Sequence, residues 1–356
     1  MMLRATRDQR VRLRRSLKGW KSVSPELRGL SKVAEVIREY YDLGEVQLPQ
    51  QFEGAHQRRH RKMTVETDAG RFLVKTYRAN PATLDALAFQ HRLADHLEKH
   101  GLPVAAIQRT REGRGVVVLD DWALELQRFI EGRPMSIDSR SLVISAEALG
   151  RFHDVCRDLP TPPRDTRMWR FSEVPRSSFE SFFERAREES SAPEVEEQCN
   201  RIALFLHDAA SALSISQRKT FETGLIHGDW HGGNLLFHGD TLIAILDLEF
   251  AGAGCYLEDL AFALSNLCIR TTANETKMRT RSELVLETYQ EARTLSPAEL
   301  SALYYAVGVK HVTTVCYQSF QQKGTVAGFS TAQWMGLLDA QCQWLGGEAR
   351  RIRWGG

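Results

Sequence analysis

The chain has few cysteines, and they show none of the spacings by which cysteine holds a metal ion or a disulfide framework. It contains no C-x-x-C pair, and its eleven histidines form no H-E-x-x-H motif. The six cysteines are scattered, at Cys156, Cys199, Cys255, Cys268, Cys316 and Cys342. Such a pattern is typical of buried thiols in a reducing compartment, so we expect a cytoplasmic protein.

Long apolar runs and a strong net charge are also absent from the sequence. It has no run of 18 apolar residues and no apolar core of a secretory signal, so we expect no membrane span. A net charge of +2 gives no general basic field for nucleic acid. The charge is uneven, because residues 1–30 carry nine Lys or Arg against Asp8 and Glu26. For the basic arm, residues 1–22, we favour a solvated helix over binding to an anionic partner.

The first part of the chain shows the alternation of β-strands. Residues 63–67 and 71–77 are alternating runs joined by Asp68-Ala69-Gly70, which predicts a hairpin. Asn80-Pro81 then predicts the start of a helix that ends near His100. Two further strands are predicted at 115–119 and 123–130. Together with a preceding helix, residues 23–131 are therefore predicted to form a small β-rich lobe.

The character changes after Glu131-Gly132-Arg133-Pro134, which is a natural hinge. Most of residues 132–356 carries helical spacing, including a capping box at Ser296-Pro297-Ala298-Glu299. With 356 residues, 42% apolar and 26% charged, the chain is long enough for two such lobes. The predicted fold class is α+β, with a small β-rich N-lobe and a larger, mostly helical C-lobe.

One polar loop in the second lobe carries the residues suited to chemistry. His227-Gly228-Asp229-Trp230-His231-Gly232-Gly233-Asn234 has the spacing H-x-D-x-x-x-x-N of a kinase catalytic loop. Residues 235–237 and 242–246 predict a hairpin that brings Asp247 beside Asn234. Two carboxylates and an amide are oxygen ligands that suit Mg2+.

The loop resembles that of the aminoglycoside phosphotransferase/choline kinase group of small-molecule kinases, which are related to protein kinases. The H-G-D-x-H-x-x-N form is typical of that group. Other matching segments are the strand 70–75, the helix 89–104, the linker 129–132 and the helix start 257–261. The resemblance covers roughly residues 33–345 and implies a bilobal protein-kinase-like fold.

Carried over to this sequence, the resemblance implies ATP, or alternatively GTP, as phosphoryl donor and Mg2+ as cofactor. Asp229 would be the catalytic base, and Asn234 and Asp247 would bind the metal. Lys75 would hold the nucleotide phosphates, and a lysine within the apolar strand Phe72–Val74 is costly unless it meets an anion. The backbone that would meet adenine belongs to Arg128, Phe129 and Ile130.

The remaining site residues have supporting roles in this interpretation. His227 would brace the loop, and His231 would support it or contact substrate. Asp259 would hydrogen-bond loop backbone, while Glu249 would be a second metal contact or face solvent. The family places a glutamate opposite its lysine where this chain has Gln90, so the charge–charge contact expected there is lost.

The function predicted is therefore phosphoryl transfer to the hydroxyl of a small molecule such as an amino sugar or amino alcohol. The Glu-rich segment 172–200 could attract a cationic acceptor, although a solvated acidic helix face is the interpretation we favour. Two alternatives remain. Gln90 favours a pseudokinase that binds nucleotide and regulates, and a protein Ser/Thr kinase is disfavoured because the H-R-D, D-F-G and A-P-E motifs are missing.

Overall fold

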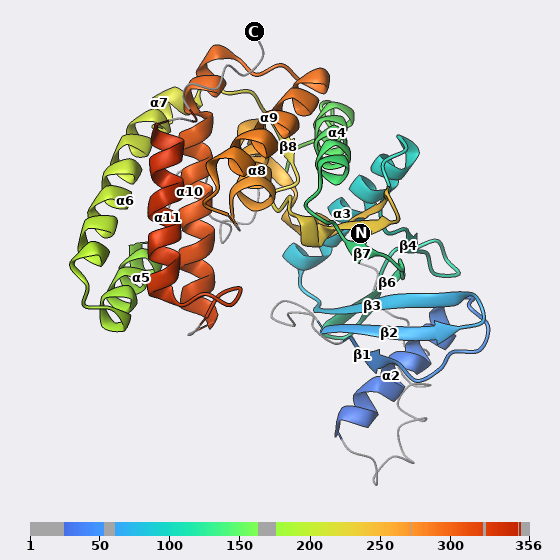
Figure 1. The fold of residues 1–356 in the computed structure, drawn as a ribbon. Helices are drawn as coiled ribbons and strands as arrows, with labels where there is room; N and C mark the ends of the chain where they lie inside the picture. Colours follow the sequence, from blue (N-terminus) through green and yellow to red (C-terminus); the bar gives the residue numbers. More distant parts are fainter. Residues whose placement is uncertain are drawn as a thin grey trace. The chain divides into compact units, whose positions relative to one another are not determined.

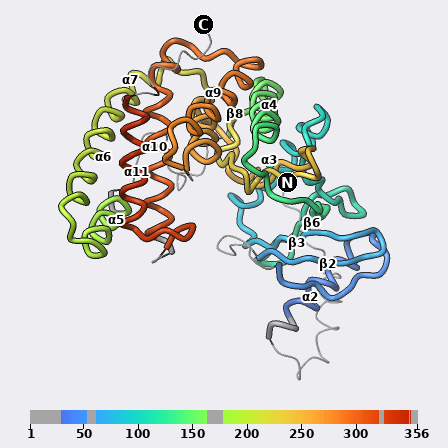
Figure 2. The backbone as a smooth tube through the Cα atoms, in the orientation of Figure 1, coloured from blue at the N-terminus to red at the C-terminus, as the bar shows by residue number. Residues whose placement is uncertain are grey.

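The computed structural model describes residues 25–52, 61–162, 176–270, 272–322, 325–347 and 349. The basic arm, residues 1–22, lies outside these ranges, as do residues 172–175 of the Glu-rich segment. The chain divides into two compact units, Met1–Glu131 and Gly132–Gly356, which Figure 2 follows from blue to red. Each unit is described by itself.

The first unit is built around a six-stranded antiparallel sheet with strand order β1-β2-β3-β6-β4, in which β5 also pairs with β6. The predicted order of strands and helix is present, with β1 and β4 as additional short strands. The elements are α2 (Pro25–Tyr40), β1 (Gln50–Gln51), β2 (Arg61–Thr67), β3 (Gly70–Arg78), α3 (Pro81–Lys99), β4 (Ile107–Gln108), β5 (Val117–Leu119) and β6 (Trp122–Arg128).

The two faces of this sheet have different partners because side chains alternate along each strand. One face packs on α2 through a core that includes Ile37, Val65, Val74 and Leu126. The helix α3 lies on the other side of the sheet, and its first turn is capped by the side chain of Asn80 as predicted (Figure 1). The sheet is therefore buried on both faces.

The second unit is mainly helical, so the predicted α+β class is confirmed. In it α4 packs on α9, and α10 packs on α6, α8 and α11. The helices are α4 (Ser139–Val155), α5 (Arg176–Glu189), α6 (Pro193–Ala212), α7 (Ile215–Arg218), α8 (Tyr256–Leu264), α9 (Glu275–Ala292), α10 (Pro297–Gln322) and α11 (Thr331–Gly346), and the π-helical turn η4 (Ser265–Ile269) extends α8. None of the described helices is long and apolar enough to cross a membrane.

Short strands and 3-10 turns between α7 and α8 carry the polar loop. They form two small antiparallel sheets, β11-β8 and β10-β9-β7, the second of which includes the short strand β7 from before α4. Their bounds are β7 (Arg133–Pro134), β8 (Thr223–Ile226), η2 (Gly232–Asn234), β9 (Leu235–His238), β10 (Thr241–Ile245), η3 (Leu248–Phe250) and β11 (Gly252–Cys255). The predicted hairpin is confirmed as the pair β9 and β10. The capping box of α10 is also confirmed, because Ser296 and Glu299 bond each other's backbone N–H.

Candidate active site

The polar loop follows β8 and turns sharply at Gly228. This glycine has φ +83°, and a Cβ placed on it would lie 2.5 Å from the Phe250 carbonyl oxygen. Only glycine accommodates both the left-handed backbone and this close approach. The turn allows the next residue, Asp229, to leave the buried strand, so that its carboxyl is partly exposed while Trp230 remains buried.

Asp229 and Asn234 are in direct contact. The Asn234 Nδ2 donates to the Asp229 backbone oxygen at 2.9 Å and to its Oδ2 at 3.0 Å. These bonds orient the amide, so Oδ1 remains as the acceptor end of a side chain that is only 6% exposed. His231 Nε2 lies 3.5 Å from the same Oδ2, while its Nδ1 accepts from the Gly233 N–H. Two neighbours therefore engage Oδ2 of Asp229.

His227 and Asp259 hold the loop from inside the unit. His227 is fully buried; its Nδ1 accepts from the Asp229 N–H, which leaves Nε2 to donate to the Leu246 carbonyl oxygen at 2.9 Å. The two oxygens of Asp259 accept from the backbone N–H groups of His227 at 2.6 Å and Gly228 at 2.7 Å. Burial alone would raise the pKa of Asp259, but the hydrogen bonds from His153 and from the Gly228 N–H hold it below its usual value.

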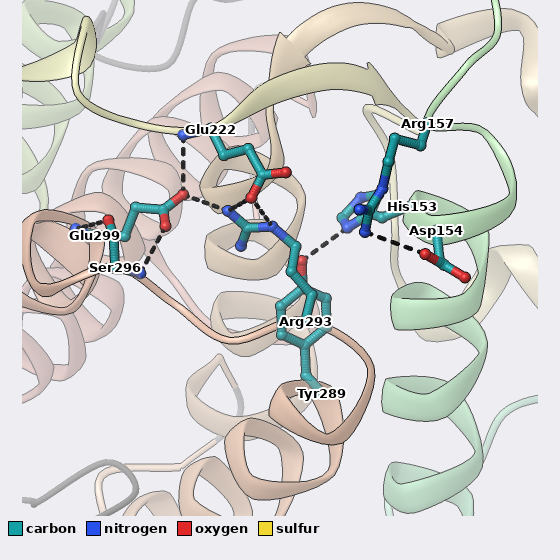
Figure 3. A network of polar contacts seen from close by, with 8 residues as sticks. All are labelled: His153, Asp154, Arg157, Glu222, Tyr289, Arg293, Ser296 and Glu299. Carbon is teal, nitrogen blue, oxygen red and sulfur yellow. Dashed lines mark hydrogen bonds and ion pairs between the residues drawn. The ribbon is translucent and has the colours of Figure 1, made fainter.

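A chain of buried polar groups continues behind Asp259. His153 of α4 bonds Asp259 Oδ2 through Nε2 at 3.1 Å. Its Nδ1 lies 2.8 Å from the hydroxyl of Tyr289 on α9, the bond drawn in Figure 3. Burial lowers the pKa of His153 despite the opposing effect of Asp259, so the ring is neutral and donates from Nε2. The tyrosine hydroxyl then donates to Nδ1. Three helices thus fix the orientation of the carboxylate that carries the loop.

Asp247 and Glu249 follow the hairpin. The Leu246 N–H donates to the Asn234 backbone oxygen at 2.8 Å, which joins the end of β10 to the end of the loop. Asp247 adopts the left-handed conformation, with φ 56° and ψ 49°. Such a backbone is uncommon outside glycine and clusters at functional sites. Glu249 lies on η3 and is partly buried.

The donor set of this loop fits a hard divalent cation. It offers the carboxylates of Asp229 and Asp247 and the Oδ1 of Asn234, whose amide nitrogen is already used by Asp229. The described residues contain no group of three or more His, Cys, Asp or Glu able to hold a metal by themselves. Mg2+ is usually bound by one or two carboxylates together with substrate phosphates and water, which matches so sparse a set.

In the first unit, the sheet face opposite α2 contains a buried pair of opposite charges that sequence reasoning missed. Lys75 on β3 is the cross-strand partner of Glu125 on β6, so their side chains share one face of the sheet. Glu125 is 0% exposed and Lys75 is 7% exposed. Lys75 has no hydrogen bond or ion pair within 4 Å to another described residue.

Glu125 is held by three side chains. His91 Nε2 lies 2.7 Å from its Oε2, while the Tyr77 hydroxyl and Gln127 Nε2 donate to Oε1 at 2.9 and 3.1 Å. Burial would raise the pKa of Glu125, but the hydrogen bond from His91 and the charge of Lys75 lower it. The carboxylate is therefore ionised beside the lysine.

The residue of α3 that reaches this pair is His91 and not Gln90. His91 is buried, whereas Gln90 beside it is only partly buried and forms no hydrogen bond with Lys75 among the described residues. Gly115 closes on the imidazole, since a Cβ there would lie 2.3 Å from His91 Nδ1. A signal for Glu125 was available, because a glutamate between Leu124 and Leu126 is as costly to bury alone as Lys75.

The linker after β6 already uses part of its backbone. The Arg128 N–H donates to Ala106 O at 2.9 Å and the Phe129 N–H to Arg71 O at 3.0 Å. The Arg71 guanidinium also lies over the Phe129 ring. Among the described residues, no partner is found for the Ile130 N–H, so it is the donor that remains for a ligand.

Similarity to solved structures establishes the fold. The chain matches an amicoumacin kinase solved with AMP-PNP, Ca2+ and Ami at TM-score 0.60 and 14% identity, covering 91% of this chain and 96% of that one. It matches a microcompartment-associated aminopropanol kinase at TM-score 0.59 and 16% identity, covering 89% and 98%. The chain therefore has the protein-kinase-like fold that these small-molecule kinases share.

The particular family follows from the sequence. Residues 53–295, more than half of the chain, match the phosphotransferase enzyme family, and the chain belongs to it. The resemblance recognised from the loop is thereby confirmed. A homoserine kinase of Nitrobacter hamburgensis is 28% identical over 242 residues, which cover 67% of this chain and 69% of that relative.

Proposed function

We propose that this protein transfers the γ-phosphoryl group of ATP to the hydroxyl of a small molecule in a Mg2+-dependent reaction. The observation that carries the proposal is the geometry of the loop. Asn234 orients the Asp229 carboxylate through Oδ2, while His227 and Asp259 fix the backbone on which that carboxylate stands. A site preorganised in this way suits a reaction that depends on positioning and charge neutralisation.

Asp229 is the general base in this proposal, and Oδ1 is the oxygen that acts. Oδ2 is already bonded by Asn234 and approached by His231. The acceptor oxygen forms a bond to the γ-phosphorus while the bond to the β-phosphate oxygen breaks, and ADP leaves. The hydroxyl proton passes to Asp229. His231 keeps the carboxylate in place from the second side.

Asn234 Oδ1 and the Asp247 carboxylate hold the metal in this proposal, with Glu249 near them on η3. When bound there, Mg2+ would neutralise charge on the phosphate oxygens. Lys75 binds the nucleotide phosphates, and Glu125 takes the part that the family gives to a helix glutamate. The Ile130 N–H binds the adenine base, and the Arg128 and Phe129 side chains flank it. GTP is the alternative donor.

A small alcohol is the acceptor that the relatives support. One is named a homoserine kinase and another an aminopropanol kinase, and both names describe small molecules with a hydroxyl group. The segment from Asp247 to the start of α8 at Tyr256 is short, which leaves little room for the activation loop of a protein kinase. We propose that the enzyme acts in the cytoplasm.

The test is ATP-dependent phosphorylation of a pool of small alcohols, with products identified by mass spectrometry. Asp229→Asn should lower kcat about 100-fold or more, because general base catalysis contributes about 10²- to 10⁴-fold. Nucleotide binding, followed by thermal shift, should persist. The matched control is Asp240→Asn, which removes an exposed carboxylate from the β9–β10 turn and should leave kcat unchanged.

Equal turnover by the wild type and Asp229→Asn would reject Asp229 as the base. ATP binding by the wild type without any phosphorylated product would indicate instead a regulatory nucleotide-binding protein, the alternative that Gln90 suggested. The buried pair of Lys75 and Glu125 argues against that outcome, because it restores the carboxylate that Gln90 lacks.

A further inference from the structure

A row of side chains runs from the catalytic loop along α8 and η4. The Phe262 ring meets the His231 ring edge-on, with centroids 6.4 Å apart. Asn266 Nδ2 donates to the Phe262 carbonyl oxygen at 3.0 Å, and Arg270 Nη1 donates to Asn266 Oδ1 at 3.0 Å. Residues four apart share a helix face, so these three side chains point the same way.

The side chain of Arg270 extends along this row in the direction of the loop. The guanidinium bonds the side chain of Asn266, four residues earlier, because long side chains of a helix lean toward its N-terminus. Its Asn266 partner is in turn bonded to the backbone of Phe262, the residue whose ring meets His231. His231 in turn is next to the carboxylate of Asp229.

The charge of Arg270 has no counter-charge among the described residues. Its partners are Asn266 Oδ1 and Gln318 Oε1 of α10, both neutral amides. Burial lowers the pKa of Arg270, and no acidic group opposes this effect. By contrast Lys310 of α10, also partly buried, has the carboxylate of Glu258 at 2.7 Å. A partly buried cation without an anion is unfavourable, and an arginine in that position is well suited to bind one.

The neutral partners also leave donors for a ligand. A guanidinium has five N–H groups, and its hydrogen bonds to described residues use one on Nη1 and one on Nη2. The Asn266 amide is itself oriented by the Phe262 carbonyl oxygen, so the fork is held before any ligand arrives. Planar, bidentate donors of this kind match a carboxylate.

We propose that Arg270 binds a carboxylate of the phosphoryl acceptor, so that the substrates are short hydroxy acids whose hydroxyl reaches Asp229. This inference rests on the proposed function and narrows its acceptor. It replaces the cationic acceptor considered for the Glu-rich segment by an acceptor that carries negative charge.

The experiment compares acceptors that differ only in that charge. Each hydroxy acid is paired with its neutral primary amide: homoserine, 4-hydroxybutanoate and glycerate with their amides. The alcohol 3-aminopropan-1-ol serves as homoserine without its carboxylate. Wild-type kcat/KM should be about 10- to 100-fold higher for the best acid than for its amide, the usual value of hydrogen bonds to a charged group.

Variants of Arg270 locate the effect. Arg270→Gln should lower kcat/KM for that acid about 10- to 100-fold and leave its amide within about twofold. Arg270→Lys keeps the charge but loses the planar, bidentate donor pair, so its kcat/KM for that acid should lie between those of the wild type and Arg270→Gln. The matched control is Arg157→Gln, which removes a guanidinium from an exposed pair with Asp154 and should change neither acceptor.

A binding measurement separates this inference from the proposed function. The acids, without ATP, should raise the Tm of the wild type and of Arg157→Gln but not of Arg270→Gln. If the amides are phosphorylated as well as the acids, or Arg270→Gln affects both equally, the carboxylate site is wrong and the kinase stands. If no acceptor is phosphorylated, the proposed function fails, and the thermal shift still decides whether Arg270 binds the acids.

Discussion

Two arginines of the helical unit show how differently one fold can treat the same charge. Arg293, between α9 and α10, is 6% exposed, and its Nη2 lies 2.7 Å from Glu299 and 2.9 Å from Glu222 (Figure 3). Burial would lower its pKa, but Tyr289, Glu299 and Glu222 raise it. Arg270 has only amides around it, and its pKa is lowered.

We infer from this difference that the charge of Arg293 serves the structure, whereas the charge of Arg270 is available for a ligand. The Glu299 carboxylate that holds Arg293 also caps the first turn of α10 and accepts from the Glu222 N–H. Arg293 therefore ties together three segments of the unit. Arg270 joins η4 to α10 through neutral groups alone, so its charge forms no ion pair among the described residues. That contrast can be tested by removing each charge.

The largest effect is expected from Arg293→Gln. The substitution leaves Glu299, which is 1% exposed, as a buried carboxylate without its cation, a loss of about 3–5 kcal/mol. Chemical denaturation should show this fall in the free energy of unfolding. The double variant Arg293→Gln/Glu299→Gln should recover part of it, because both charges are then gone. A single variant as stable as the wild type would contradict the structural role of the pair.

The second prediction concerns Lys75. Its charge lies beside the Glu125 carboxylate, and in our proposal it also binds the nucleotide phosphates. Glu125→Gln should raise the KM for ATP about 10-fold or more, because the lysine loses the charge of its neighbour, and opposite charges a few ångström apart attract by about 1.4 kcal/mol or more at an effective dielectric constant of about 20. Gln90→Ala should change the KM less than about threefold, since no hydrogen bond joins Gln90 to Lys75 among the described residues. Nucleotide titrations of both variants decide which residue positions the lysine. A larger effect at Gln90 would restore the helix residue to that role.

The contrast between Glu125 and Gln90 also marks the limit of sequence reasoning. The loop, the β9–β10 hairpin and the cap at Ser296 could be predicted because each depends on residues within a few positions of one another. The partner of Lys75 could not, because it depends on the register of β3 on β6, 50 residues apart in sequence. On α3, a shift of one residue separates Gln90 from His91, and one residue turns a helix by about 100°.

Arg270 shows a different limit. A basic residue at the end of an apolar helix is unremarkable in sequence, because a cation near a helix C-terminus is favourable and usually solvated. Whether Arg270 has a counter-charge depends on how α10 packs against η4. That packing brings Gln318 to the guanidinium, and no carboxylate among the described residues. A sequence cannot reveal that a counter-charge is missing before the neighbours of the residue are known.

A smaller effect on stability is therefore expected from Arg270→Gln. Removing a buried charge that lacks a counter-ion relieves its desolvation, and the new amide can still donate to Asn266 or Gln318. The free energy of unfolding should stay within about 1 kcal/mol of the wild type, in contrast to Arg293→Gln. Denaturation curves of the two variants under the same conditions provide the comparison. A loss of several kcal/mol at Arg270 would mean that its charge is structural after all.

The smallest effect concerns His311, the buried neighbour on which the charge of Arg270 acts. Burial lowers the pKa of His311 to about 4, and Arg270 contributes to the shift against the opposing hydrogen bond of Gln341. Because the folded pKa lies below the unfolded value of 6.5, stability from this group is complete above pH 6.5. It falls as the pH drops toward 4, by at most about 1.4 kcal/mol per pH unit. His153 adds a fall of the same sign, so the informative quantity is the difference in pH dependence between variants.

Arg270→Gln should raise the His311 pKa by less than about one unit, since burial is the larger cause. The decline between pH 6.5 and 4 should then be shallower than in the wild type and in Arg157→Gln. Histidine ring proton titrations by NMR, together with unfolding curves at several pH values, measure this difference. An unchanged His311 titration would show that the Arg270 charge is already neutralised in the folded protein.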